Sequence, residues 1–172
     1  MESVVAEQIS KSIRASETVV PYGPGAVVDI LGQSFMVPTG DKWPPARLRE
    51  EVKHDRLAAR LNVQELWGAP TTAEPESATV PGLEFERFPG WLFCQVCRRM
   101  VKWSRSMETG KAPQCPQDAC DGRLVPMRFV AVCTERSHLS DIPWAFWVHR
   151  DTDGACSADD RLNFRTLKGR AE

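Results

Sequence analysis

The N-terminal half of the chain begins with a pattern of apolar and polar residues that is typical of a hairpin. In residues 26–37, AVVDILGQSFMV, two apolar runs flank a polar segment that contains a glycine. This pattern predicts two short paired strands. The preceding PYGPG disfavours regular structure, because its prolines fix φ and its glycines favour turns. We therefore expect a tight turn followed by a β-hairpin.

A helical period follows over residues 45–61. Pro44 and Pro45 suit the first turn of a helix, where a missing backbone N–H is tolerated. Apolar side chains then recur at roughly helical spacing, with charged side chains between them. These apolar residues are Leu48, Val52, Leu57 and Leu61. We expect one amphipathic helix whose charged side faces solvent.

A change of composition separates the two halves. Residues 68–82, GAPTTAEPESATVPG, combine prolines, glycines and small polar residues, which indicates a linker or an exposed loop. The expected organisation is therefore a hairpin and helix region over residues 1–67, the linker over 68–82, and a second module over 83–172.

The second module contains four cysteines in two close pairs. Cys94 and Cys97 read C-x2-C, and Cys115 and Cys120 read C-x4-C after a gap of 17 residues. Such spacings are typical of a tetrahedral zinc site, and the gap is long enough for a hairpin between the pairs. Strand-like segments flank the array on both sides. The expected fold class is α+β, with an N-terminal hairpin and helix, a linker, and a zinc-ribbon-like β module with an irregular C-terminal extension.

Other uses of these cysteines fit the sequence less well. CQVC on its own is compatible with a thioredoxin-like redox pair, but no βαβ pattern surrounds it. Disulfides require an oxidising compartment. A site with four cysteine ligands leaves no open coordination position, so we expect its zinc to stabilise the fold and not to catalyse.

A second group of potential ligands follows the first. Cys133, His138, His149 and Cys156 could form a second zinc site with two cysteines and two histidines. The alternative is lone buried cysteines and a histidine that only packs among the tryptophans.

Basic and aromatic residues are interleaved between the cysteine pairs. A net charge of −1 and a pI near 6.3 exclude a polycationic chain, so any contact with nucleic acid must come from a local patch. The candidate residues for phosphate contact and base stacking are Arg98, Arg99, Lys102, Trp103 and Arg105. A solvated basic face is the alternative.

Nothing in the sequence predicts an enzyme or a membrane protein. There is no G-x-S-x-G, H-E-x-x-H or phosphate-binding loop, and no apolar run reaches the roughly 20 residues that a membrane span needs. The N-terminus does not resemble a signal peptide, so we expect a cytoplasmic protein. The enzyme alternative would use Cys133, His138 and His149 around a metal with an open position.

Aromatic residues are concentrated in the segment DIPWAFWVH, residues 141–149. Large apolar groups on both sides of one short element suit a packing or docking face. We expect Trp144, beside Pro143, to belong to the core and Trp147 to be a candidate contact for a partner. Ordinary core packing of both tryptophans is the alternative.

Several segments, taken in order, resemble the N-terminal part of the DrmB family, helicase-associated proteins of the DISARM anti-phage system. The resemblance covers about residues 9–165. It is carried by SIRASETVVPYGPGAVVDI, DKW, RLAARL, VPGLEFERFPGWLFCQVC, CPQDAC, LVPMRFVAVC and SHLSDIPWAFWVH. Two positions depart from the family pattern, which usually has glutamine at the position of Glu17 and glycine at the position of Ser137.

The resemblance implies a non-catalytic partner of a superfamily 2 helicase-like motor protein that helps the motor engage foreign DNA. Family members are several times longer, so this chain is expected to be a fragment or a shortened relative. A stand-alone zinc-ribbon protein that binds nucleic acid is the competing interpretation.

Overall fold

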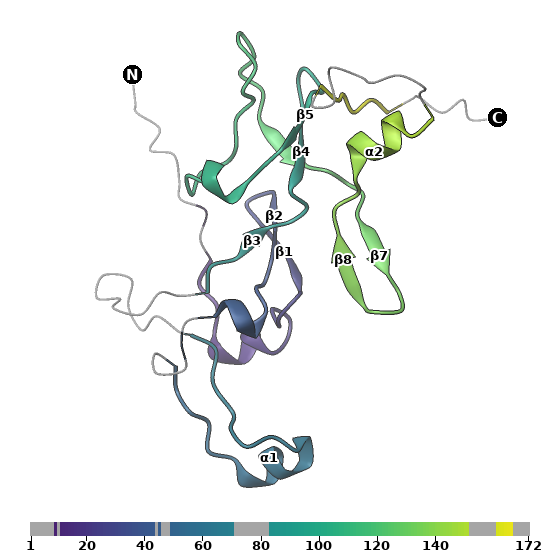
Figure 1. The fold of residues 1–172 in the computed structure, drawn as a ribbon. Coiled ribbons are helices and arrows are strands. Elements are labelled where there is room, and N and C mark those ends of the chain that lie inside the picture. The colour runs from purple at the N-terminus through teal and green to yellow at the C-terminus, as the bar shows by residue number, and fades with distance from the viewer. Residues whose placement is uncertain are drawn as a thin grey trace, which may run out of the picture. The chain divides into compact units, whose positions relative to one another are not determined.

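The computed structural model describes residues 9, 11–43, 45, 49–70, 83–151 and 161–166 (Figure 1). The chain forms two compact units. One comprises residues 1–10, 29–34 and 87–172, and the other comprises residues 11–28 and 35–86. Among the described residues, no helix is long and apolar enough to cross a membrane.

The unit of residues 11–28 and 35–86 contains most of the N-terminal elements. They are η1 (Ala15–Thr18), η2 (Gly40–Lys42), α1 (Asp55–Leu61), and parts of β1 (Val27–Ile30), β2 (Gln33–Met36) and β3 (Glu86–Arg87). The three strands form a sheet in the order β1-β2-β3. The predicted hairpin over 26–37 is confirmed. Its turn lies at Leu31 and Gly32, which have left-handed φ values of 53° and 72°.

The predicted helix over 45–61 is wrong in its first part. Of the described residues in this range, only those of α1, Asp55–Leu61, are helical. Backbone pairing with a later segment is the reason: Glu51 and Trp67 form an antiparallel bridge. On either side of this bridge, the N–H of Val52 donates to the Leu66 carbonyl at 2.8 Å, and the N–H of Gly68 donates to the Glu50 carbonyl at 2.8 Å. Groups used in this pairing are not available for helical hydrogen bonds.

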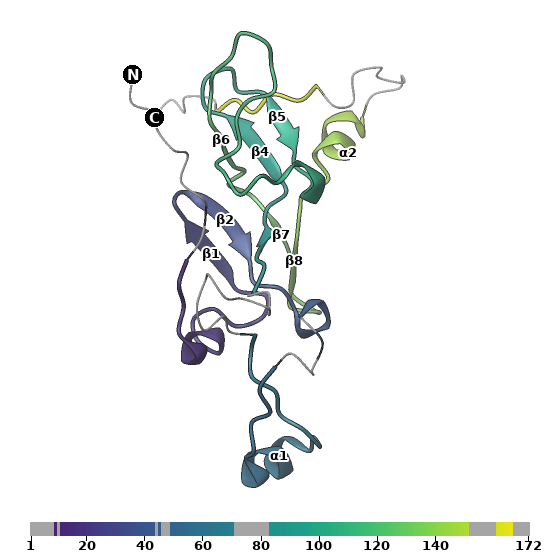
Figure 2. The ribbon, with the colours of Figure 1, turned by 90° about the vertical axis from the view of Figure 1, so that its left-hand side faces the viewer.

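The larger unit is built around a small antiparallel sheet with the strand order β5-β4-β6. Figure 2 shows these strands side by side. The elements of this part of the chain are β4 (Trp91–Cys94), β5 (Met100–Lys102), η4 (Arg105–Met107), β6 (Leu124–Pro126), β7 (Ala131–Cys133), β8 (His138–Ser140) and α2 (Trp144–His149). β7 and β8 form a separate hairpin. The mixed fold with a zinc-ribbon-like sheet agrees with the expected class.

All four residues of β4 are buried, so this strand has apolar neighbours on both faces. The buried cluster on one face consists of Trp91, Phe93, Met100, Met127 and Leu162. The cluster on the other consists of Leu92, Cys94 and Leu124, and the remaining three cysteines of the two pairs pack against it. The strand thus joins the apolar core to the cysteine array.

The predicted linker over 68–82 lies mostly outside the described residues, which include only 68–70 of it. The division of the chain at that segment stays a prediction.

Candidate metal centre

The first cysteine pair is placed by the end of β4 and the turn that follows. The N–H of Arg98 donates to the Cys94 carbonyl at 3.1 Å, and the N–H of Cys94 donates to the Arg99 carbonyl at 2.8 Å. The N–H of Val96 donates to Cys94 Sγ at 3.4 Å. Arg98 has a left-handed φ of 67°, which returns the chain into β5. This tight turn places the Cys97 thiol beside that of Cys94.

The second pair lies in the turn that leads into β6. The N–H of Cys115 donates to the Gly122 carbonyl at 2.9 Å, which closes the loop that carries Cys120. The register of the sheet then pairs Leu124 with Cys94. The antiparallel pairing of β4 with β6 therefore brings the second pair of cysteines to the first.

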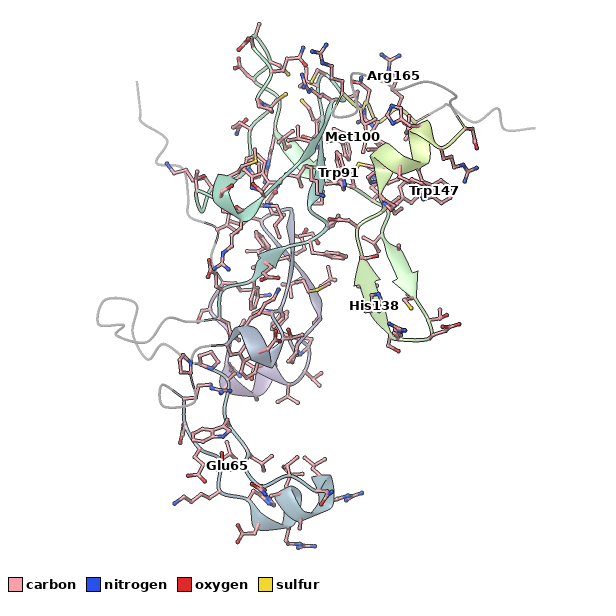
Figure 3. The ribbon with its side chains drawn as sticks, in the orientation of Figure 1. Glu65, Trp91, Met100, His138, Trp147 and Arg165 are labelled. Atoms are coloured by element: carbon pink, nitrogen blue, oxygen red, sulfur yellow. The ribbon has the colours of Figure 1, made fainter. Side chains whose placement is uncertain are left out.

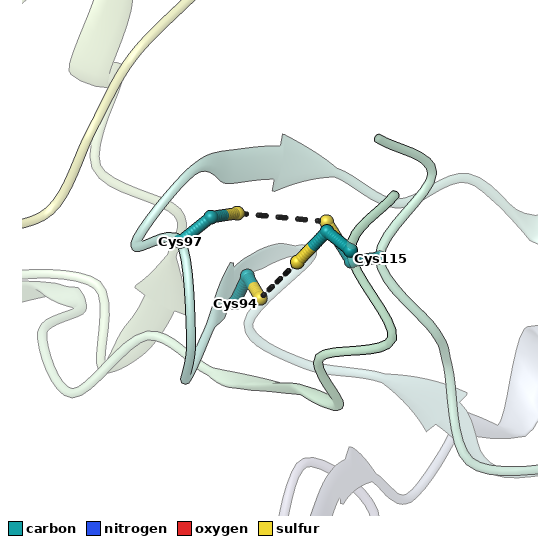
Figure 4. Close-up of side chains that lie close together, drawn as sticks. Cys94, Cys97 and Cys115 are labelled. Carbon is teal, nitrogen blue, oxygen red and sulfur yellow. Dashed lines mark hydrogen bonds between the residues drawn. The ribbon is translucent and has the colours of Figure 1, made fainter. Parts of the chain in front are cut away.

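The four sulfur atoms form one group, with all Sγ atoms within 4.8 Å of one another. The distances from Cys94 to Cys120 and from Cys97 to Cys115 are both 3.7 Å (Figure 4). A zinc ion with Zn–S bonds of about 2.3 Å in a tetrahedron requires sulfur atoms roughly 3.8 Å apart. Four cysteine thiolates are also the soft ligands that zinc prefers. The residues therefore fit a closed zinc site in both geometry and chemistry.

The thiols of the group differ in acidity. Burial raises the pKa of Cys94, but hydrogen bonds to its sulfur lower it more and bring this pKa to about 7. These bonds come from the backbone N–H groups of Cys97 and Val96 and from the thiols of Cys97 and Cys120. Burial, followed by the neighbouring thiols, raises the pKa of Cys115 to about 12. Thiols this close cannot all ionise alone, because like charges repel. A divalent cation supplies the missing charge and favours deprotonation of all four.

Sequence reasoning missed Gly122, which the centre requires. A Cβ atom added at this glycine would lie 2.2 Å from Cys94 Sγ and 3.1 Å from Val96 Cβ. No side chain fits there without moving Cys94 Sγ. The only signal in the sequence is a glycine two residues after Cys120, in CDG.

The second predicted ligand group is not tested, because Cys156 lies outside the described residues. Cys133 and His138 are directly opposite each other on β7 and β8. Figure 3 shows His138 toward the turn of this hairpin, whereas His149 is the last residue of α2 and its Nδ1 lies 2.6 Å from the Ala145 carbonyl oxygen. Within the described ranges, the four cysteines of the first group are the only set of three or more ligand atoms gathered for a metal.

The predicted basic residues have different surroundings. The guanidinium of Arg98 lies over the rings of Phe93 and Phe164, 4.5 Å and 5.4 Å from their centroids, and its Nε donates to the Phe164 carbonyl at 2.9 Å. Trp103 packs against the cluster of Leu92, Cys94 and Leu124. Of the other three candidates, Arg99 is half-buried, and Lys102 and Arg105 are exposed. Contact of these residues with nucleic acid stays a prediction.

The two tryptophans of α2 differ as expected. Trp144 packs against the core cluster that contains Trp91 and makes an edge contact with Phe129, with ring centroids 6.5 Å apart. Trp147 is 55% exposed, and the Arg150 guanidinium lies 4.9 Å from the centroid of its ring.

Comparison with known proteins gives a family and one related segment. A family model described as "Domain of unknown function (DUF8724)" matches residues 14–172, so the chain belongs to this family. In addition, 50 residues are 42% identical to the DISARM protein DrmB of Bacillus paralicheniformis (strain ATCC 9945a / NCIMB 11709 / CD-2). This match covers 29% of the chain and 8% of the relative.

Proposed function

We propose that this DUF8724 protein is a non-catalytic, zinc-stabilised accessory component of a DISARM-type anti-phage system. In that role it works beside a helicase-like motor protein and helps the motor engage foreign DNA. The observation that carries the proposal is the segment 42% identical to a DISARM protein DrmB, in a chain that also contains a closed group of four thiols. With four cysteine ligands a metal has no free position for substrate, which supports a structural role for the metal.

The exposed side of α2 is the surface that we assign to the motor protein. Three neighbouring apolar side chains there are well exposed: Phe146 by 67%, Trp147 by 55% and Val148 by 59%. Large aromatic side chains are preferred anchors of protein interfaces. Trp144, on the same helix, packs against the core and so fixes the position of this surface.

The test is co-expression of the chain with the helicase-like protein encoded in the same defence system, followed by affinity capture through a tag on the motor. The proposal predicts a complex that survives gel filtration and that Trp147→Ala weakens. The matched control is Leu57→Ala on α1, which removes a similarly exposed apolar side chain elsewhere. If wild-type chain does not associate with the motor, the accessory role is wrong. If the chain alone still binds DNA, a stand-alone nucleic-acid-binding protein is favoured.

A further inference from the structure

The β5-β4-β6 sheet continues at its β5 edge through a segment close to the C-terminus. Residues 161–166 run antiparallel beside residues 98–100, with Arg99 and Asn163 paired at the centre. Backbone hydrogen bonds of 2.8 Å and 2.9 Å lie on either side of this pair. The pair itself is therefore of the non-hydrogen-bonded kind, in which opposite side chains lie closest together.

The alternation of side chains along this segment separates apolar from basic residues. Leu162 is only 7% exposed and belongs to the core cluster. Arg161, Asn163 and Arg165 alternate with the buried positions and are exposed. Because opposite residues of a pair lie on the same face, Arg99 joins these three. Figure 3 shows the Arg165 side chain pointing away from the ribbon.

Positive charge is concentrated only locally, because the unit as a whole is nearly balanced, with fourteen lysines and arginines against thirteen aspartates and glutamates in its sequence. The two paired segments, residues 98–102 and 161–166, contain no acidic residue.

We propose that Arg99, Arg161 and Arg165 bind the phosphodiester backbone of nucleic acid. A guanidinium group donates two parallel hydrogen bonds to a phosphate, and its charge does not titrate. Arg161 and Arg165 lie roughly 13 Å apart along an extended strand, and each strand of duplex DNA carries one phosphate per about 3.4 Å of helix axis, so the two guanidinium groups can reach different phosphates. Asn163 lies between the arginines and adds an amide donor. This inference deepens the proposed function, because it gives DNA engagement a surface on this chain.

The experiment measures fluorescence anisotropy of short labelled DNA, double-stranded and single-stranded, with the zinc-loaded full chain at about 50 to 200 mM potassium chloride. The variant combines Arg99→Gln, Arg161→Gln and Arg165→Gln. We expect roughly tenfold weaker binding at the lowest salt. The slope of log affinity against log salt should fall by about one per phosphate contact removed, and so by about three. The decrease should be the same for unrelated DNA sequences, because phosphate contacts carry no sequence information.

Two matched variants interpret the result. Lys53→Gln, Arg56→Gln and Arg60→Gln together remove three exposed charges in α1 and just before it, and should leave the slope unchanged. Arg99→Lys, Arg161→Lys and Arg165→Lys preserve the charges and should retain most of the slope. This variant keeps the effect of charge measurable even if the glutamine variant loses zinc. An unchanged slope in the glutamine variant, or an equal loss in the α1 variant, overturns the inference. Absence of DNA binding by the wild-type chain also overturns it, but leaves capture by the motor protein as a separate test of the accessory role.

Discussion

Strand β4 and helix α1 are held in place by different means. Every residue of β4 is buried, and the strand carries the first ligand of the cysteine group. No residue of α1 is buried, and its apolar side chains Leu57 and Leu61 are 41% and 55% exposed. The helix relies on local bonds, such as the N–H of Leu57 donating to His54 Nδ1 at 3.2 Å.

The difference teaches where stability resides in this protein. Around β4, contacts between residues far apart in sequence combine apolar burial with the geometry of a metal site. Around α1, a capped helix and a short backbone pairing provide few buried contacts, and such regions open at low free energy. A substitution in the first region should therefore lower the stability of the fold strongly, and a substitution in the second only slightly.

The largest effect is expected from Cys97→Ser. Losing one thiolate removes much of a zinc-binding free energy that is on the order of 10 kcal/mol in zinc-finger peptides. Hydrogen exchange should show lost protection across the β5-β4-β6 sheet and unchanged protection at α1. Cys133→Ser is the control, because this cysteine lies outside the group of four. Uniform loss of protection along the whole chain would remove the distinction between the two regions.

A smaller effect is expected from Trp144→Ala, measured by urea unfolding. This tryptophan packs against the core cluster, so its truncation should lower the free energy of unfolding by roughly 3–5 kcal/mol. Trp147→Ala should lower it by less than about 1 kcal/mol, since that side chain is 55% exposed and its contact with Arg150 is superficial. Equal losses for the two variants would mean that Trp147 belongs to the core and is not an interface residue.

Next comes the ion pair of Arg87 and Glu108. The Arg87 side chain is 4% exposed, and it also donates to the Gln33 Oε1 at 2.6 Å. Glu108→Ala removes the carboxylate that pairs with this buried guanidinium and should cost roughly 3 kcal/mol. The exposed pair of Lys42 and Glu86 in the other unit is the comparison, and Lys42→Ala should cost less than about 1 kcal/mol. Thermal unfolding of both variants measures the difference, and similar costs would contradict the assigned burial.

The smallest effect is expected from Leu57→Ala on α1. Leucine at this position is 41% exposed, and alanine is the better helix former, so the two contributions nearly cancel. Unfolding in urea should change by less than about 0.5 kcal/mol. A loss above about 2 kcal/mol would show that α1 is packed against something that stabilises it.

The hairpin and the two cysteine pairs could be predicted because each depends on local sequence. Glycine beside a β-branched run specifies a turn between strands, and the C-x2-C and C-x4-C spacings specify ligand pairs. Residues 50–52 could not be placed correctly, because their pairing with residues 66–68 replaces the helix that their own pattern indicates.

The surroundings of the basic residues could not be predicted for a similar reason. Arg98 stacks on Phe164, 66 residues away, and no local pattern reports such a contact. Gly122 was missed because its role depends on the distance to Cys94 Sγ across the sheet. In each case the deciding contact joins segments that are separate in sequence.

The central claim is that the four cysteines hold a zinc ion that stabilises the unit built around the β5-β4-β6 sheet. The most direct measurement is the zinc content, by plasma mass spectrometry, of the chain purified without chelator. The wild-type chain should contain at least about one zinc ion per chain. Gly122→Ala should lose about one equivalent of zinc. The control Gly40→Ala should match the wild-type content, because no atom lies within 4 Å of the added Cβ atom. Less than half an equivalent in the wild-type protein, or an unchanged content in Gly122→Ala, would contradict the account.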